Sequence, residues 1–128
     1  MTKILQGIAE AKLCAVTTDD SGTMEGRYLF TDRFAGFTGH FPEHPILPAI
    51  VEIMTVVFLV GEQTGCRQRL VAVEDAKFLK PVHPNQELLV RCRQRTVKGK
   101  LLYDAQLTVG DTTTATMLLE LACAGELP

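Results

Sequence analysis

The sequence predicts an α+β fold in which an antiparallel sheet of about six strands wraps around one long helix. Three observations support this prediction. Residues 46–60 form an apolar stretch interrupted by Glu52, and such a helix is enclosed on most of its sides. Segments with partial two-residue alternation precede and follow this stretch. Compact glycine-containing links between the later segments favour antiparallel hairpins.

The first elements are a short helix and two strands. Residues 2–11 have the apolar spacing of an amphipathic helix. Residues 12–18 and 24–31 are expected to form strands on either side of Asp-Asp-Ser-Gly at 19–22, a composition that favours a tight reversal. We therefore expect a hairpin at the start of the sheet.

The long helix is expected over residues 46–63. Pro48 suits its first turn, and Gly65 suits a stop just past its end. The links Lys98-Gly99 and Gly110-Asp111 then separate strands of the second half. Four strands are expected there, at 69–78, 87–97, 101–109 and 112–122.

The composition is typical of a folded globular protein. A chain of 128 residues suffices for one ordinary domain, so we expect residues 1–128 to form a single domain. Apolar residues make up 46% of the chain and charged residues 22%, unlike disordered or collagen-like sequences. The net charge of −2 and the absence of Trp argue against a nucleic-acid partner.

Cysteine usage and the apolar stretch predict the compartment. No CxxC pair is present and no leader is seen at the N-terminus, so we expect reduced thiols and a cytoplasmic protein. The apolar stretch is shorter than the roughly twenty residues of a bilayer span. It predicts a buried helix and no membrane span. The cysteines are Cys14, Cys66, Cys92 and Cys123.

Charge is unevenly distributed along the chain. Nine basic and three acidic residues lie between Arg67 and Lys100. These basic residues are interpreted either as the solvated outer faces of strands or as a docking surface for an acidic partner or a phosphate-bearing ligand.

Two motifs lie thirty to forty residues apart. Residues 37–42 read Phe-Thr-Gly-His-Phe-Pro, residues 45–48 read Pro-Ile-Leu-Pro, and residues 76–84 read Ala-Lys-Phe-Leu-Lys-Pro-Val-His-Pro. They resemble the GHFP…PxxPG and KFxxPVxPGD motifs of the hot-dog-fold (3R)-hydroxyacyl-acyl-carrier-protein dehydratases. The resemblance covers about residues 24–122 and implies a hot-dog fold. Residues 1–23 lack the family's usual histidine- and proline-containing segment, so the chain resembles a divergent member.

The chemistry of this family requires a base, an acid and a dipole for the thioester oxygen. His40 matches the family's catalytic histidine and is the candidate base; the alternative is a structural histidine that binds its own loop. Backbone N–H groups of the helix start, at Ala49, are the candidate oxyanion site. The family has glycine where Ala49 stands, so the added methyl group crowds that site.

The acid departs from the family pattern. The family's Glu or Asp, fourteen positions after the histidine, corresponds to Met54, which cannot donate a proton. Glu52 is the nearest carboxylate, but two residues turn a helix by about 200°. An isolated charge in an apolar helix nevertheless suggests a function. Glu52 is therefore the candidate acid, and the alternative is a structural ion pair with an arginine or a second subunit.

The resemblance also implies an acyl tunnel beside the helix and a homodimer or higher homo-oligomer with shared sites. The alternative for the tunnel residues is ordinary core packing. His44 is expected to be exposed and His83 to lie in a turn. The histidines lack the spacing of metal ligands, and the sequence has no glycine-rich phosphate-binding loop. We therefore expect neither a metal nor a cofactor. The candidate substrate-binding residues are Phe41, Pro48, Met54, Val57, Phe58 and Phe78.

Three functions are compatible with these residues. The first is a dehydratase that acts on acyl-carrier-protein or coenzyme A thioesters of 3-hydroxyacyl groups in fatty-acid or related lipid and polyketide synthesis. The second is a thioesterase of the same fold, which activates water with a helix carboxylate. The third is a catalytically impaired subunit that binds acyl thioesters and pairs with an active relative.

Overall fold

The computed structural model describes residues 2–37 and 45–126. They form two α-helices, a short 3-10 helix and the strands of one sheet. In chain order they are α1 (Thr2–Ala11), β1 (Thr17–Thr18), β2 (Met24–Leu29), the 3-10 helix η1 (Ala35–Phe37), α2 (Ala49–Thr64), β3 (Cys66–Phe78), β4 (Glu87–Val97), β5 (Lys100–Val109) and β6 (Thr112–Glu126).

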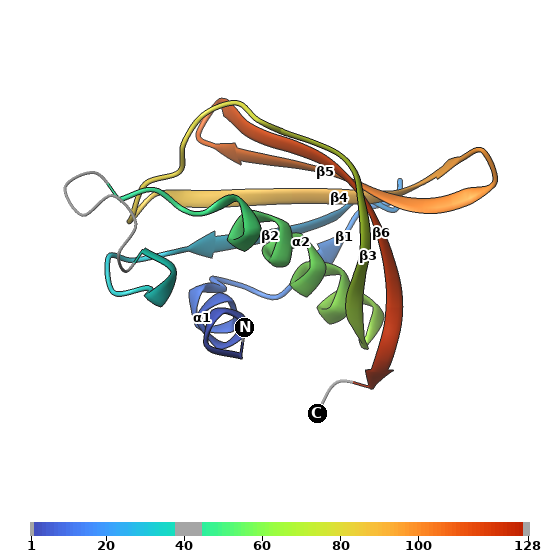
Figure 1. Cartoon of the computed structure of the whole chain (residues 1–128), viewed down its shortest axis with the longest axis horizontal. Helices are drawn as coiled ribbons and strands as arrows, with labels where there is room; N and C mark the ends of the chain where they lie inside the picture. The colour runs from blue at the N-terminus through green and yellow to red at the C-terminus, as the bar shows by residue number, and fades with distance from the viewer. Residues whose placement is uncertain (1, 38–44, 127–128) are drawn as a thin grey trace.

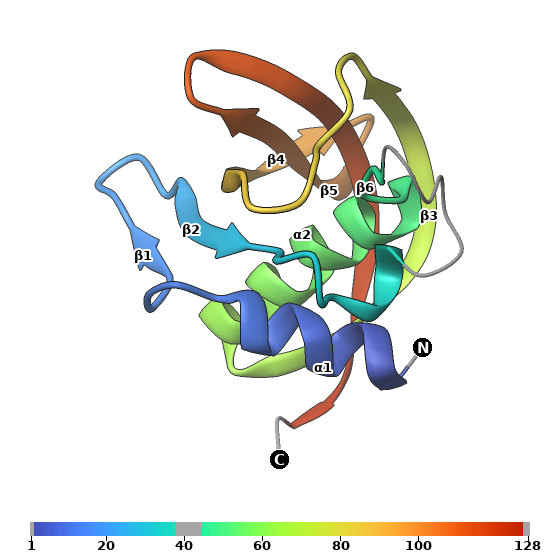
Figure 2. The same ribbon diagram turned by 90° about the vertical axis from the view of Figure 1, so that its left-hand side faces the viewer.

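The strands form one antiparallel sheet in the order β1-β2-β4-β5-β6-β3. Strand β2 pairs with β4, although α2 and β3 separate the two in the sequence. The sheet curves around α2, and α1 packs against the other side of that helix (Figures 1 and 2). The predicted hot-dog arrangement of a sheet wrapped around one long helix is confirmed.

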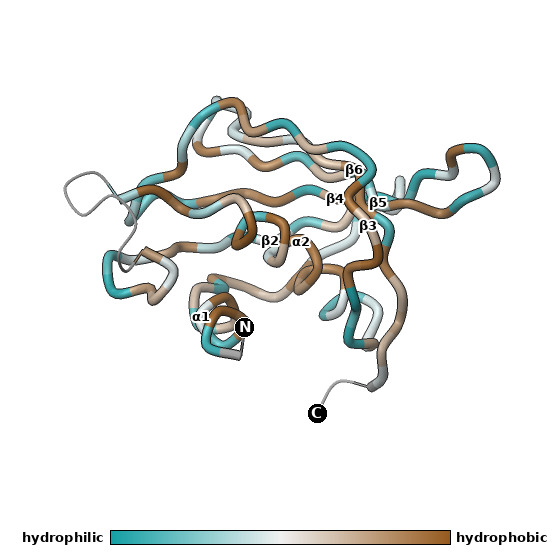
Figure 3. The backbone as a smooth tube through the Cα atoms, viewed as in Figure 1, coloured by the Kyte–Doolittle hydropathy of each residue, from teal (hydrophilic) through white to brown (hydrophobic). Residues whose placement is uncertain are grey.

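Helix α2 is the centre of the core. Most of its residues are buried, and the helix is hydrophobic along most of its length (Figure 3). Val56, Leu59 and Val60 have no solvent exposure. On β2, Gly26 faces this helix, and a Cβ added there would lie 2.7 Å from Cδ1 of Leu59. The glycine therefore lets β2 approach α2 closely.

Helix α2 begins at Ala49, three residues after the predicted start. Pro48 is its N-cap residue, with an extended backbone at φ −62° and ψ 146°. Because a residue that precedes a proline avoids the helical region, Leu47 cannot extend the helix backwards. The predicted stop is confirmed, since Gly65 adopts φ 71° and donates its N–H to the Gly61 carbonyl at 3.0 Å.

The predicted strand over residues 12–18 is wrong over most of its length. Only Thr17–Thr18 pairs as a strand, and Lys12 forms an isolated bridge with Tyr28. The Lys12 Nζ instead reaches Oε1 of Glu62 on α2 at 2.7 Å. The backbone at residues 12–13 still contacts β2 through the bridge to Tyr28 and through the Leu13 N–H, which donates to the Arg27 carbonyl at 2.9 Å.

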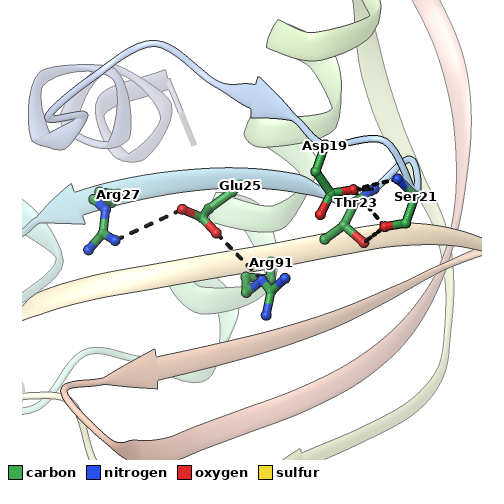
Figure 4. Close-up of polar contacts among 6 residues, drawn as sticks. All are labelled: Asp19, Ser21, Thr23, Glu25, Arg27 and Arg91. Atoms are coloured by element: carbon green, nitrogen blue, oxygen red, sulfur yellow. Dashed lines mark hydrogen bonds and ion pairs between the residues drawn. The ribbon is translucent and has the colours of Figure 1, made fainter.

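The predicted reversal at residues 19–22 is confirmed (Figure 4). Oδ1 of Asp19 accepts hydrogen bonds from the Ser21 N–H at 2.9 Å, the Ser21 hydroxyl at 2.6 Å and the Thr23 N–H at 3.1 Å. These bonds hold the pKa of Asp19 below its ordinary value. Within the turn, the carboxylate therefore accepts hydrogen bonds from backbone N–H groups in place of a backbone carbonyl.

The basic residues between Arg67 and Lys100 are exposed, most of them on strands, and several form ion pairs. Arg91 lies 3.5 Å from Glu25, and Arg95 lies 3.4 Å from Asp104 (Figure 4 shows the first pair). Their side chains are exposed, so each pair contributes little to stability. For these residues, the solvated outer face is the better interpretation.

The expectation of four reduced thiols is wrong for two of them. Cys66, at the start of β3, is disulfide-bonded to Cys123 on β6. The two are separated by 57 positions and become neighbours only through the pairing of these strands. Cys14 and Cys92 are free. Among the described helices, none has the length and apolar character to cross a bilayer.

Replacing Cys123 by Ser should lower the free energy of unfolding in the absence of reductant. The chain-entropy estimate for a loop of this size is about 4 kcal/mol, as an upper value. Urea unfolding with and without dithiothreitol measures the effect, with Cys14→Ser as the control. Equal unfolding midpoints for wild type and Cys123→Ser without reductant would show that the pair is not bonded in solution.

Candidate active site

The first turn of α2 brings Glu52 into the protein interior. This residue is 4% exposed, although a glutamate at the start of a helix is usually solvated. Its Oε1 has no hydrogen-bond partner, and its carboxyl forms no ion pair with another residue in 2–37 or 45–126. Within the described part of the chain, the expected alternative of an ion pair with an arginine is therefore absent.

Burial raises the pKa of Glu52 from 4.5 to about 8. The positive end of the helix dipole favours the charged form of a carboxyl, but loss of hydration has the larger effect here. Glu52 is accordingly protonated at neutral pH. A protonated carboxyl can donate a proton, whereas an ionised one cannot.

Glu52 lines a cleft of about 260 Å³ that joins the two sequence motifs. Phe78 and Ala49 line the same cleft, so the structure brings three of the predicted site residues together. The other lining residues come from the segments that precede α2 and follow β3: Ile46, Leu47, Leu79, Lys80 and Pro81. An acidic side chain thus lies in a mostly apolar hollow next to a helix N-terminus.

Met54 and Phe58 do not line this cleft. They are half-buried on the strip of α2 that continues from Ile50, which is 46% exposed. Phe58 makes an edge-on contact with Tyr28, with ring centroids 6.5 Å apart. Pro48 precedes the helix as its cap and is not among the lining residues. The structure therefore places Glu52, and not Met54, in the cleft.

Two predicted residues lie outside the described part of the chain. His40 and Phe41 belong to residues 38–44, as does His44. The role of His40 as the base therefore stays a prediction. The described residues on either side of this segment are well anchored, since Phe37 is buried against Phe34 and Leu47 is 3% exposed.

Sequence reasoning missed the second wall of the cleft. Leu79, Lys80 and Pro81 belong to the motif at 76–84, but only Phe78 of that motif was expected to contact substrate. The motif itself was the available signal, because its resemblance to the family extends through Pro81. A larger hollow of about 550 Å³ lies between α1 and residues 29–35, and the charged side chains that line it, Lys3, Glu10 and Arg33, are all exposed. It offers no comparable chemistry.

No cluster of three potential metal ligands is found among the described residues. Tyr28 has the other buried side-chain atom without a hydrogen-bond partner in this part of the chain. Its ring lies in an aromatic cluster with Phe30 and Phe58, and it does not line the Glu52 cleft. Glu52 is therefore the buried polar group that adjoins an accessible hollow.

Comparison with known proteins relates this chain to dehydratases. A family model described as ApeI-like, ApeI dehydratase, matches residues 16–117. The 3-hydroxyacyl-acyl-carrier-protein dehydratase FabZ of Alkalilimnicola ehrlichii is 30% identical over 90 residues, which cover 62% of this chain and 58% of the relative. The corresponding enzyme of Ehrlichia chaffeensis is 32% identical over 114 residues, or 75% of this chain and 78% of the relative.

Among solved structures, the dehydratase heterocomplex ApeI:P from Xenorhabdus doucetiae has a similar fold. The TM-score is 0.69 at 21% identity, and the alignment covers 88% of this chain and 96% of the other. For the first-ranking FabZ relatives, the aligned part spans 60% or less of their length. The fold similarity is consequently more extensive than the sequence similarity.

Replacing Glu52 by Gln should change how stability depends on pH. The unfolded chain loses the Glu52 proton near pH 4.5 and the folded chain near pH 8. Between these values the folded state binds one more proton, so the free energy of unfolding falls as pH rises, by at most about 1.4 kcal/mol per pH unit. Glu52→Gln removes this dependence and gains stability over wild type as pH rises.

Urea unfolding at pH 5, 6.5 and 8.5 measures the difference between variant and wild type. Glu10→Gln, on the exposed face of α1, is the control and should show the wild-type dependence. An unchanged pH dependence in Glu52→Gln would contradict a buried, protonated carboxyl.

Proposed function

The chain belongs to the ApeI-like dehydratase family, and from this membership and the buried Glu52 we propose that it removes water from 3-hydroxyacyl thioesters. The product is the trans-2-enoyl thioester. The observation that supports the proposal most is a protonated carboxyl in an apolar cleft beside the first turn of α2. Such a group is a general acid at neutral pH.

The proposed reaction uses His40, Glu52 and the start of α2. His40 takes the proton from C2 of the acyl group, and the electrons of that bond form the C2–C3 double bond. The hydroxyl on C3 leaves as water with the proton from Glu52. The Val51 and Glu52 N–H groups donate to the Pro48 carbonyl. The N–H groups that precede them, at Ala49 and Ile50, are therefore the ones proposed to stabilise the charge on the thioester oxygen. No cofactor takes part in these steps.

The raised pKa of Glu52 favours this proposal over a thioesterase. A thioesterase needs an ionised carboxylate to activate water, and Glu52 remains mostly protonated below about pH 8. The third alternative, a catalytically impaired subunit, is supported by Met54 at the family's acid position and by the heterocomplex that the similar ApeI protein forms. It remains the main competing function.

The substrate carrier and the compartment are also part of the proposal. Lys80 at the cleft and the exposed Lys77 carry positive charge that suits the phosphate of a phosphopantetheine carrier or of coenzyme A. We propose the cytoplasm as the compartment of this thioester chemistry.

Enoyl formation should require both Glu52 and His40. Glu52→Gln, like His40→Ala, is expected to lower kcat by about 10²–10⁴-fold, the contribution of an acid or base to such a step. Glu62→Gln is the matched control, because it lies on the same helix and pairs with Lys12. The assay follows enoyl product and free thiol with 3-hydroxyacyl thioesters of several chain lengths.

In wild type, kcat should fall above about pH 8 as Glu52 loses its proton. Thiol release without enoyl product would identify a thioesterase instead. Binding of the thioester with neither product would identify the impaired subunit.

We further propose a homodimer that forms through β3. This strand lies at the edge of the sheet and, among the strands of residues 2–37 and 45–126, pairs only with β6. It also exposes large apolar side chains, with Val71 at 42% and Val73 at 43%. An uncovered edge with apolar residues is a ready surface for another strand.

Val73→Lys should therefore convert a dimer to a monomer, as measured by light scattering on a sizing column. Leu101→Lys is the control, because Leu101 is equally exposed but lies on β5. A wild-type monomer at micromolar concentration would oppose the homodimer and favour a different partner chain.

A further inference from the structure

The turn that joins β3 to β4, at residues 79–86, touches the chain on both sides of residues 38–44. The Leu47 N–H donates to the Val82 carbonyl at 2.7 Å. The Asn85 N–H donates to the Phe30 carbonyl at 2.8 Å. Val82 is 1% exposed, so the centre of the turn is fixed in the core. One turn thereby anchors both the end of β2 and the segment that precedes α2.

His83 adds a side-chain contact to this turn. Its Nδ1 lies 3.2 Å from the carbonyl oxygen of Pro45. A carbonyl can only accept, so Nδ1 must carry the proton. The His83 N–H donates to Oε1 of Gln86 at 2.9 Å, which fixes the backbone that carries the ring. The imidazole therefore holds the first described residue after position 44.

These contacts join the two walls of the Glu52 cleft. One wall is made by Ile46 and Leu47, directly after Pro45. The opposite wall is made by Lys80 and Pro81, directly before Val82. The bond from Leu47 to Val82 and the contact from His83 to Pro45 cross from one wall to the other behind the cleft.

We propose that His83 is a positioning residue that fixes the spacing between these walls and thereby the approach of the acyl thioester to Glu52. The effect on the thioester rests on the proposed function, whereas the effect on the walls does not. His83 does not take part in proton transfer.

The exposure of His83 allows a clean test. An exposed hydrogen bond adds little to the free energy of unfolding, since water competes for both partners. Removing the ring should therefore leave the fold intact while it loosens the segment at 45–47. Asn places an amide N–H donor at about the position of Nδ1, so His83→Asn is the conservative replacement.

The experiment compares wild type with His83→Ala and His83→Asn, with Arg95→Ala as the control that loses an exposed contact on the outer face of the sheet. Amide hydrogen exchange measures how firmly the cleft walls are held. Steady-state kinetics with a 3-hydroxyacyl thioester measures how well the substrate approaches Glu52. Thermal unfolding reports overall stability.

We expect His83→Ala to speed exchange at the Leu47 amide, with an unchanged unfolding midpoint. We also expect kcat/KM to fall by roughly two- to tenfold, the size of one hydrogen bond, mainly through a higher KM. His83→Asn should restore both readouts, and Arg95→Ala should change neither.

The proposal is overturned if His83→Ala leaves exchange at Leu47 unchanged, or if His83→Asn behaves like His83→Ala. It is also overturned if exchange rises equally throughout the sheet, because His83 would then support the fold in general. A wild type without activity would refute the proposed function alone. The exchange measurements would still decide the role of His83.

Discussion

The enclosure of α2 by the sheet is the constraint on which the rest of the molecule depends. An isolated apolar helix of this length gains its stability from packing and not from propensity. Val56, Leu59 and Val60 are fully buried. Gly26 on β2 has no side chain, so the strand can approach α2 closely. This packing also fixes the rotation of the helix about its axis. Turning it would bring the half-buried strip with Met54 inward and expose buried valines.

That fixed rotation decides which side chain reaches the cleft. Glu52 lies in the first turn, close to the cleft between the two motifs, while Met54 lies on a different side of the same helix. The Oε1 of this buried carboxyl has no hydrogen-bond partner among the described residues, which costs free energy, and protonation of the group lowers that cost. A cost of this kind is usually retained at functional sites. The loss of a carboxylate at position 54 is therefore not the loss of an acid from this helix.

The sequence was most informative where local patterns and tertiary packing agree. The long helix, its stop at Gly65 and the four later strands could be predicted, because apolar periodicity and glycine turns report them directly. The interruption of the strand at 12–18 could not, since its residues alternate as a strand would and only the tertiary pairing limits the ladder to Thr17–Thr18 and a bridge at Lys12. The same holds for the bond between Cys66 and Cys123, which requires β3 to pair with β6. The helix start was predictable in principle from Pro48, through its effect on Leu47.

The candidate site combines one rigid group with groups on connecting segments. Glu52 is carried by the buried helix, so its position follows from the core, whereas the cleft walls at 46–47 and 80–81 come from loops. A catalytic constellation needs both to be held within fractions of an ångström. The buried Val82 and the bond from Leu47 to its carbonyl tie these loops to the same core that holds the helix. One packed core therefore holds both Glu52 and the cleft walls, as the proposed dehydration requires.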